Sequence, residues 1–305
     1  MTTSVPASAV HSSFGEWAFT AGQNGLHPLV LVVGTRGKST VARLLDSIAS
    51  SAGLRTALRT DAGVEIEGKR QLGDIHPLSE ALDELDQGQI DLAIVEMAWG
   101  DLNTLPLGDR KPGGVIVSTI CPHKDYCLLD DTRRAITSLK HMLVGTPPST
   151  LITADIDDSA FPSLNDVDFD NLILTTASDE HPTLQRYLGD GGLAVWTGDD
   201  HLVVGSLGRM HLRLPIEMIP ITMHGTALFQ MRNLMLAAGM AIGMGISPAD
   251  VERGLLGVQP TNAWLPTSLN SFTASGVRVL IDRPSPSWFL GPLLRATRAM
   301  KAPRQ

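Results

Sequence analysis

Cysteine is scarce in this sequence of 305 residues, which contains only two. Cys121 and Cys127 lie close together with His123 between them, and no second pair of ligands completes any zinc spacing. The pattern argues against a structural zinc site. A disulfide between the two is not expected either, because the other features of the sequence indicate a cytoplasmic protein.

Long apolar runs and excess positive charge are also missing. No apolar run approaches the roughly 18 residues that a membrane-spanning helix needs. The first residues, MTTSVPASAVHSS, lack the basic start and apolar stretch of a signal peptide, so we expect a cytoplasmic protein without a membrane partner. The formal net charge of -8 argues against non-specific duplex binding, which depends on Lys and Arg, and we expect no nucleic-acid partner.

The rest of the composition is that of an ordinary globular protein. Hydrophobic residues make up 43% and charged residues 18%, without a low-complexity tract or a block of like charges. The length suits one large α/β domain, or one such domain with a small appendage.

Apolar strands alternate with amphipathic helices along most of the chain. The first strand, residues 29–33, ends at Gly34, and apolar residues recur at helical spacing from Ser39 onward. Further strands are predicted at 56–58, 92–95, 115–117, 149–152 and 172–175, and helices at 78–85 and 132–144. This alternation predicts a doubly wound, mostly parallel sheet flanked by helices on both faces.

The pattern of apolar and polar residues changes in the last third of the sequence. Short alternating segments between residues 193 and 223 predict a small antiparallel β-subsheet. Residues 230–244, rich in Met, Leu and Ala, predict a buried helix whose methionines fill the core. Ser247 followed by Pro248 is a typical helix start, and a last strand is predicted at 277–282.

A glycine-containing loop stands where the first strand turns into a helix. Its glycines let backbone amides approach phosphate oxygens, and the helix N-terminus adds partial positive charge. Lys38 can reach the terminal phosphates, and Ser39 can ligate Mg²⁺. The predicted ATP-binding residues of this loop are Gly34, Thr35, Arg36, Gly37, Lys38, Ser39 and Thr40. Val32 takes the place of the first glycine of the longer, more common phosphate loop.

The loop sequence GTRGKST resembles the nucleotide loop of the Mur ligase superfamily, which includes folylpolyglutamate, poly-γ-glutamate and cyanophycin synthetases. Further segments resemble the ligase module of cyanophycin synthetase in the same order: residues 60–68, 73–74, 95–102 and 224–233. The resemblance spans about residues 28 to 260. It implies an ATP- and Mg²⁺-dependent ligase that joins a carboxylate to an amino acid or peptide through an acyl phosphate.

The resemblance also implies roles for residues outside the loop. Glu96 ends a predicted strand at the carboxyl edge of the sheet and matches a glutamate that coordinates Mg²⁺ near the γ-phosphate. His123 matches a histidine that holds a second Mg²⁺. Because Pro122 replaces the family's aspartate, an ordinary loop histidine is an equal alternative. Lys38, Glu96 and His123 are thus the implied catalytic residues. Lys140 is nearest to a lysine that relatives carbamylate, but a solvated helix lysine explains it better.

Two further positions are implied to contact the nucleotide. Asn233 matches an asparagine that approaches adenine, and an amide can both donate to and accept from that base. A solvent-facing amide is the alternative. Asp282 matches the first residue of a family segment whose histidine is missing here. Residues 153–158 resemble the family's Asn-Ala-Asp-Asp segment, and their carboxylates also suit the capping of a turn.

The resemblance suggests a division of the chain. We expect a leader at residues 1–27, the ATP-binding central domain at 28–260, and a linker with a remnant of a C-terminal domain at 261–305. The family's phosphate-contacting arginine is absent from residues 260–264. Two functions therefore stay open: a ligase, slightly favoured, and a nucleotide-binding regulator or subunit completed by a partner protein, for which the basic residues 295–304 offer a docking place. A simple ATPase or kinase is less favoured.

Overall fold

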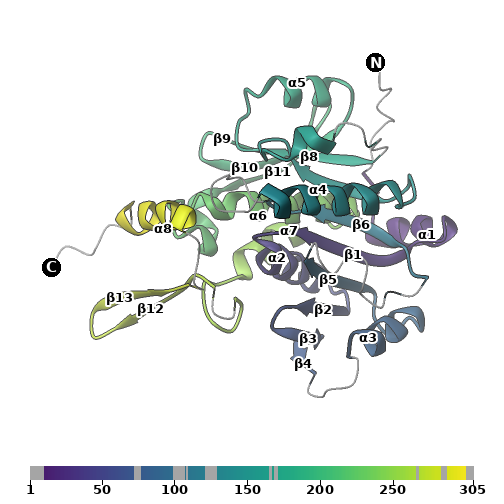
Figure 1. Ribbon diagram of the computed structural model, residues 1–305, viewed down its shortest axis with the longest axis horizontal. Coiled ribbons are helices and arrows are strands. Elements are labelled where there is room, and N and C mark those ends of the chain that lie inside the picture. The colour runs from purple at the N-terminus through teal and green to yellow at the C-terminus, as the bar shows by residue number, and fades with distance from the viewer. Residues whose placement is uncertain are drawn as a thin grey trace.

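An 11-stranded sheet runs through the centre of the molecule, with its strands in the order β11-β10-β9-β8-β7-β6-β1-β5-β2-β3-β4 (Figure 1). The structure is a computed structural model that describes residues 10–71, 77–98, 107, 109–120, 129–164, 167, 171–265, 268–282 and 287–299. The strands are β1 (His27–Gly34), β2 (Thr56–Thr60), β3 (Gly63–Ile66), β4 (Lys69–Arg70), β5 (Leu92–Ala98), β6 (Pro112–Val117), β7 (Leu151–Asp155), β8 (Leu172–Thr176), β9 (Leu193–Gly198), β10 (His201–Ser206) and β11 (Arg209–Pro215).

The centre of this sheet is parallel and its two edges are antiparallel. Every pairing from β2 through β5, β1, β6, β7 and β8 to β9 is parallel. Antiparallel pairs add β3 and β4 at one edge and β10 and β11 at the other. The predicted fold class is confirmed. The antiparallel strands expected between residues 193 and 223 continue the main sheet, because β9 pairs with β8.

Helices cover both faces because the central strands are apolar on both sides. In β1, Leu29, Leu31 and Val33 belong to one core cluster, whereas Val30 and Val32 belong to another. The first cluster includes residues of α3 (Pro77–Asp86) and α4 (Leu129–Val144). The second includes residues of α2 (Lys38–Ser51), α6 (Phe229–Gly243) and α7 (Pro248–Gly257). Side chains alternate along a strand, so each strand contributes to both layers.

Several predicted helices form as expected. The side chain of Ser247 accepts a hydrogen bond from the amide of Asp250 at 3.2 Å, which caps α7. Met235 and Met240 of α6 are fully buried in the core, as the sequence predicts. A shorter helix, α5 (Pro182–Gly189), packs on the β8–β9 side of the sheet.

A helix not predicted from the sequence lies in the expected leader. α1 (Phe14–Gln23) begins at Ser13, whose side chain accepts from the amide of Glu16. Trp17 of this helix is only 2% exposed and belongs to the same core cluster as Val30. Residues 14–23 are therefore part of the packed body. Phe14, Trp17, Ala18 and Ala21 recur at helical spacing, but over only ten residues, and this short signal was missed.

The chain leaves the sheet after α7. β12 (Asn270–Ala274) and β13 (Val277–Ile281) form a separate antiparallel hairpin, followed by α8 (Ser287–Ala299). Figure 1 shows the hairpin and α8 at one end of the molecule, next to the N-terminal part of α6. None of the helices that the structure describes has the length and apolar character needed to cross a membrane.

The contact between α2 and α7 generates a stability prediction. A Cβ atom at Gly254 of α7 would lie 2.4 Å from the Cα atom of Ile48 in α2, so the Gly254→Ala variant must push the two helices apart. We expect it to lower the free energy of unfolding by about 1–3 kcal/mol in urea denaturation.

Gly257→Ala is the matched control, because the added methyl group at the end of the same helix would lie 3.5 Å from the Ser47 hydroxyl, an ordinary contact. Its free energy of unfolding should stay within about 1 kcal/mol of the parent value. Equal stability of Gly254→Ala and the parent protein would contradict the close packing of α2 on α7.

Candidate functional site

A pocket of about 780 Å³ opens where β1 ends and α2 begins. This volume lies within the range of roughly 300–1,000 Å³ that is usual for small-molecule sites. Six residues of the predicted phosphate loop, Thr35 to Thr40, line the pocket. Glu96 at the end of β5, Asn233 on α6 and Asp282 after β13 line it as well. The fold thus brings together predicted site residues from four distant parts of the sequence.

The loop is held in place by Thr119, the second residue after the end of β6. The carbonyl oxygen of Thr119 accepts hydrogen bonds from the amides of Thr35 and Arg36, at 2.9 and 3.2 Å. It also accepts one from the hydroxyl of Thr35 at 2.8 Å. Those two amides are therefore engaged within the protein. The first turn of α2 remains the part of the loop suited to an anion, because its N-cap Gly37 makes no side-chain capping bond.

Two glycines permit this tight arrangement. Gly34 has a φ of +141°, and a Cβ atom there would lie 2.3 Å from the hydroxyl oxygen of Ser118. Gly37 has a φ of +84°, and its Cβ atom would lie 2.3 Å from Oδ1 of Asn233. Any side chain at either position would therefore displace the loop from β6 or from α6.

Lys38 and Glu96 form an ion pair at the base of the loop. Nζ of Lys38 lies 3.5 Å from Oε1 of Glu96, whose side chain is 1% exposed. The backbone amide of Asp61 donates to the other oxygen, Oε2, at 3.2 Å. Oε1 has no hydrogen-bond donor among the residues that the structure describes. A buried carboxylate oxygen that lacks a donor is costly for a fold and is well suited to receive a further cation.

The donors near this carboxylate fit Mg²⁺. This ion usually binds one or two protein oxygen ligands and completes its shell with phosphate oxygens and water. Glu96 supplies the carboxylate, and the hydroxyl of Ser39 lines the same pocket. Among the residues with described positions, no group of three or more His, Cys, Asp or Glu side chains is arranged to hold a metal by itself.

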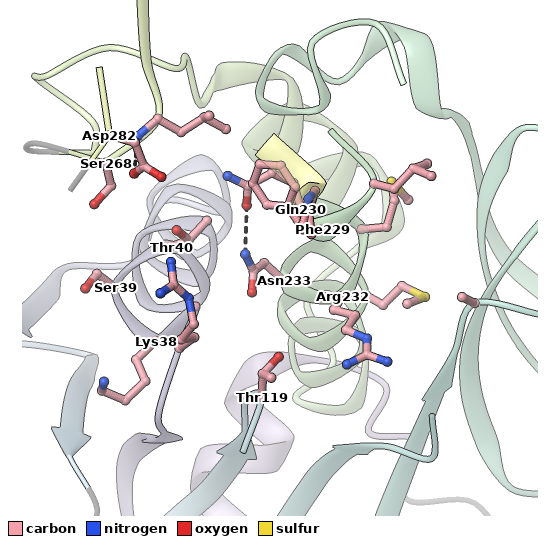
Figure 2. Close-up of a pocket in the computed structure, with 18 of the residues that line it drawn as sticks. Lys38, Ser39, Thr40, Thr119, Phe229, Gln230, Arg232, Asn233, Ser268 and Asp282 are labelled. Atoms are coloured by element: carbon pink, nitrogen blue, oxygen red, sulfur yellow. Dashed lines mark hydrogen bonds between the residues drawn. The ribbon is translucent and has the colours of Figure 1, made fainter. Parts of the chain in front are cut away.

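Asn233 lies beneath the loop. Its Nδ2 donates to Oε1 of Gln230 at 2.7 Å, as the dashed line in Figure 2 shows, while Oδ1 faces Gly37. The side chain of Asn233 is 7% exposed. In this arrangement its amide supports the loop, and its contact with a base stays a prediction.

Arg232 lies at the side of the pocket away from Lys38 and Asp282 in Figure 2. Its Nε lies 2.8 Å from Oδ2 of Asp155, at the end of β7, although the geometry is not that of a hydrogen bond. Burial raises the pKa of Asp155 to about 7, and the charge of Arg232 opposes this rise. The turn that follows is capped as the sequence suggested: Asp155 accepts from the amide of Asp157, and Asp158 from that of Ala160.

Arg36 and Asp282 bring opposite charges to the pocket from the loop and from the end of the hairpin. Burial lowers the pKa of the Arg36 guanidinium, and the negative charge of Asp282 counteracts that shift. Asp282 also accepts a hydrogen bond from the amide of Leu269 at 3.1 Å. Asp282 therefore lines the same pocket as the loop, and its contact with a nucleotide stays a prediction.

Some predicted residues lie elsewhere, and some pocket residues were missed. His123 lies outside the described residues, as do Cys121 and Cys127. Lys140 sits on α4 and is not among the residues that line the pocket. Thr119 was not predicted, although it follows a strand at the carboxyl edge where doubly wound sheets bind ligands. Its position just after a strand was the signal that could have identified Thr119 as a pocket residue.

Comparisons with known proteins show what this chain is similar to. No protein-family model matches the sequence. The chain is 24% identical over 263 residues to cyanophycin synthetase of Nostoc sp. The matched region covers 85% of this chain and 29% of that protein. Cyanophycin synthetase of Synechocystis sp. is 24% identical over 268 residues, covering 87% and 30%. The chain thus spans less than a third of the length of these curated relatives.

Solved structures share the fold. A UDP-N-acetylmuramoyl-L-alanyl-D-glutamate–2,6-diaminopimelate ligase superposes with a TM-score of 0.62 at 14% identity, covering 92% of this chain and 56% of that one. Folylpolyglutamate synthetase from Lactobacillus casei superposes with a TM-score of 0.58 at 13% identity, covering 95% and 76%. The chain is thus similar in sequence to cyanophycin synthetases over most of its length, and it shares its fold with Mur ligases and folylpolyglutamate synthetase.

Proposed function

We propose that the chain binds ATP with Mg²⁺ and acts as an ATP-dependent ligase that joins a carboxylate to an amine through an acyl phosphate. The observation that carries the proposal is the buried Glu96 carboxylate. It lies 3.5 Å from the ammonium group of Lys38, the first residue of α2. A phosphate loop, a lysine and a carboxylate at one edge of a parallel sheet suit a terminal phosphoryl group and its metal ion.

Different residues of the pocket have different proposed roles in phosphoryl transfer. The uncapped first turn of α2 binds phosphate oxygens, and Lys38 stabilises the negative charge of the transferring group. Ser39 and Glu96 would hold Mg²⁺, which neutralises charge on the phosphate oxygens when bound. We propose His123 as a further ligand of the metal ion, as the resemblance implies. These roles require positioning and charge, and no protein nucleophile.

The proposed reaction proceeds in two steps. An oxygen of the substrate carboxylate forms a bond to the γ-phosphorus as the bond to ADP breaks, which produces the acyl phosphate and ADP. The nitrogen of an amino acid or peptide then bonds to the acyl carbon, phosphate leaves, and the amine loses a proton. Residues 28–260 are the proposed ATP-binding domain, with residues 261–305 forming a linker and part of a further domain.

Removal of the loop lysine tests nucleotide binding. In isothermal titration with ATP and MgCl₂, we expect Lys38→Ala to weaken binding about 10- to 100-fold, because a charge-assisted contact to phosphate is lost. Lys69→Ala removes the same charge from the exposed strand β4 and should bind ATP like the parent protein. Failure of the parent protein to bind ATP would overturn the proposal.

A second prediction concerns the close approach of the loop to α6. Gly37→Ala should weaken ATP binding at least tenfold, because the added methyl group collides with Asn233 and displaces the loop. Gly25→Ala introduces the same left-handed strain, at a φ of +68° but in open space, and should leave the affinity unchanged. Equal affinities of the two variants would show that the loop tolerates displacement.

Turnover separates a ligase from a binding protein. We expect ADP release from ATP to depend on both a carboxylate acceptor and an amino acid, and Glu96→Gln to lose at least 100-fold in this rate. ATP binding without acceptor-dependent turnover would favour a regulator or subunit. Release that needs no acceptor would indicate a simple ATPase.

A further inference from the structure

The helix α8 contributes to the pocket although it lies far from the phosphate loop in sequence. Pro292 and Arg295 of this helix line the same pocket as Arg36 and Lys38. Figure 1 shows α8 beside the N-terminal part of α6, the helix that carries Gln230 and Asn233. A ligand that fills the pocket would therefore meet α8 as well as the loop.

Apolar contacts fix the position of α8. Ala296, which directly follows Arg295, is 1% exposed and belongs to a small core cluster with Met223, Ala227 and Leu269. Leu293 of the same helix packs against that cluster. The backbone at Arg295 is therefore anchored beside the segment that leads into α6, while its side chain is exposed.

Arg295 differs from the other positively charged residues of the pocket in its interactions. The lining of the pocket includes four side chains of Arg and Lys and three of Asp and Glu. Lys38 pairs with Glu96, and Arg232 pairs with Asp155 outside the lining. Arg36 experiences the charge of Asp282.

Arg295, in contrast, has no hydrogen bond or ion pair with any residue whose position the structure describes. A guanidinium that has no partner within the described structure and lines a ligand-sized pocket is suited to an anion, and its planar donors match the oxygens of a phosphate group.

We propose that Arg295 is a phosphate-binding residue that reaches a bound nucleotide from α8. The inference rests on the proposed function, because it takes the nucleotide to be the ligand of this pocket. The polyphosphate is then held between the first turn of α2 and the guanidinium of Arg295. Nucleotide binding thereby couples α8 to the sheet.

A charge-matched pair of variants tests the inference. In titrations with Mg²⁺ and ATP, we expect Arg295→Ala to weaken binding about 10- to 100-fold. Arg298→Ala removes the same charge three residues later on the same helix. Arg298 is exposed and does not line the pocket, so this variant should stay within about twofold of the parent affinity.

Inorganic tripolyphosphate distinguishes a phosphate contact from a contact to the base or ribose. The inference predicts that Arg295→Ala weakens the binding of tripolyphosphate and of ATP by the same factor. Loss of ATP affinity with unchanged tripolyphosphate affinity would overturn it, as would equal losses in the two arginine variants. If the parent protein binds ATP and Arg295→Ala binds it equally well, the inference fails while the proposed function stands. If the parent protein does not bind ATP, both fail.

Discussion

The loop that joins β1 to α2 is held in a fixed position, and that position determines where the other functional groups lie. A single carbonyl oxygen, that of Thr119, accepts three hydrogen bonds from Thr35 and Arg36. On either side of that anchor, Gly34 and Gly37 approach their neighbours so closely that no side chain fits. The loop is thereby fixed against both β6 and α6. The start of α2 and the side chain of Lys38 follow from that position.

Two buried carboxylates flank this loop at the carboxyl edge of the sheet. Glu96 lies near the end of β5 beside Lys38, and Asp155 ends β7 beside Arg232. Each has one oxygen that lacks a hydrogen-bond donor within the described structure. Burial of such groups costs stability, which a fold tolerates where a ligand or a cation can use them. Lys38 and Arg232 thus place one positive charge on each side of the site proposed for the phosphates.

Much of the fold follows from simple patterns in the sequence. The apolar residues of β1 alternate between two core layers, so an uninterrupted apolar run correctly predicts a strand covered on both faces. The glycine and lysine of the loop lie at a strand-to-helix turn, and Glu96 and Asp282 line the same pocket as that loop. Residue types and the known geometry of parallel sheets predicted the loop, whereas the prediction of Glu96 also used the resemblance to the Mur ligase superfamily and that of Asp282 depended on it.

Other features depend on contacts that no local pattern reveals. α1 was missed because its apolar residues recur at helical spacing over only ten residues, and the burial of Trp17 in the core is visible only in the fold. The amide of Asn233 is engaged by Gln230 and faces Gly37, a packing detail that only the fold determines. Arg295 could not be connected with the pocket from sequence, because the anchoring of α8 involves residues near 223, 227 and 269.

A crystal structure with Mg²⁺ and a non-hydrolysable ATP analogue would test the central claim most directly. The account predicts density for the β- and γ-phosphates at the first turn of α2, with Lys38 in contact with them and a metal ion at Glu96. Phosphates bound elsewhere in the molecule, or a nucleotide that leaves Lys38 and Glu96 as they are paired here, would contradict it.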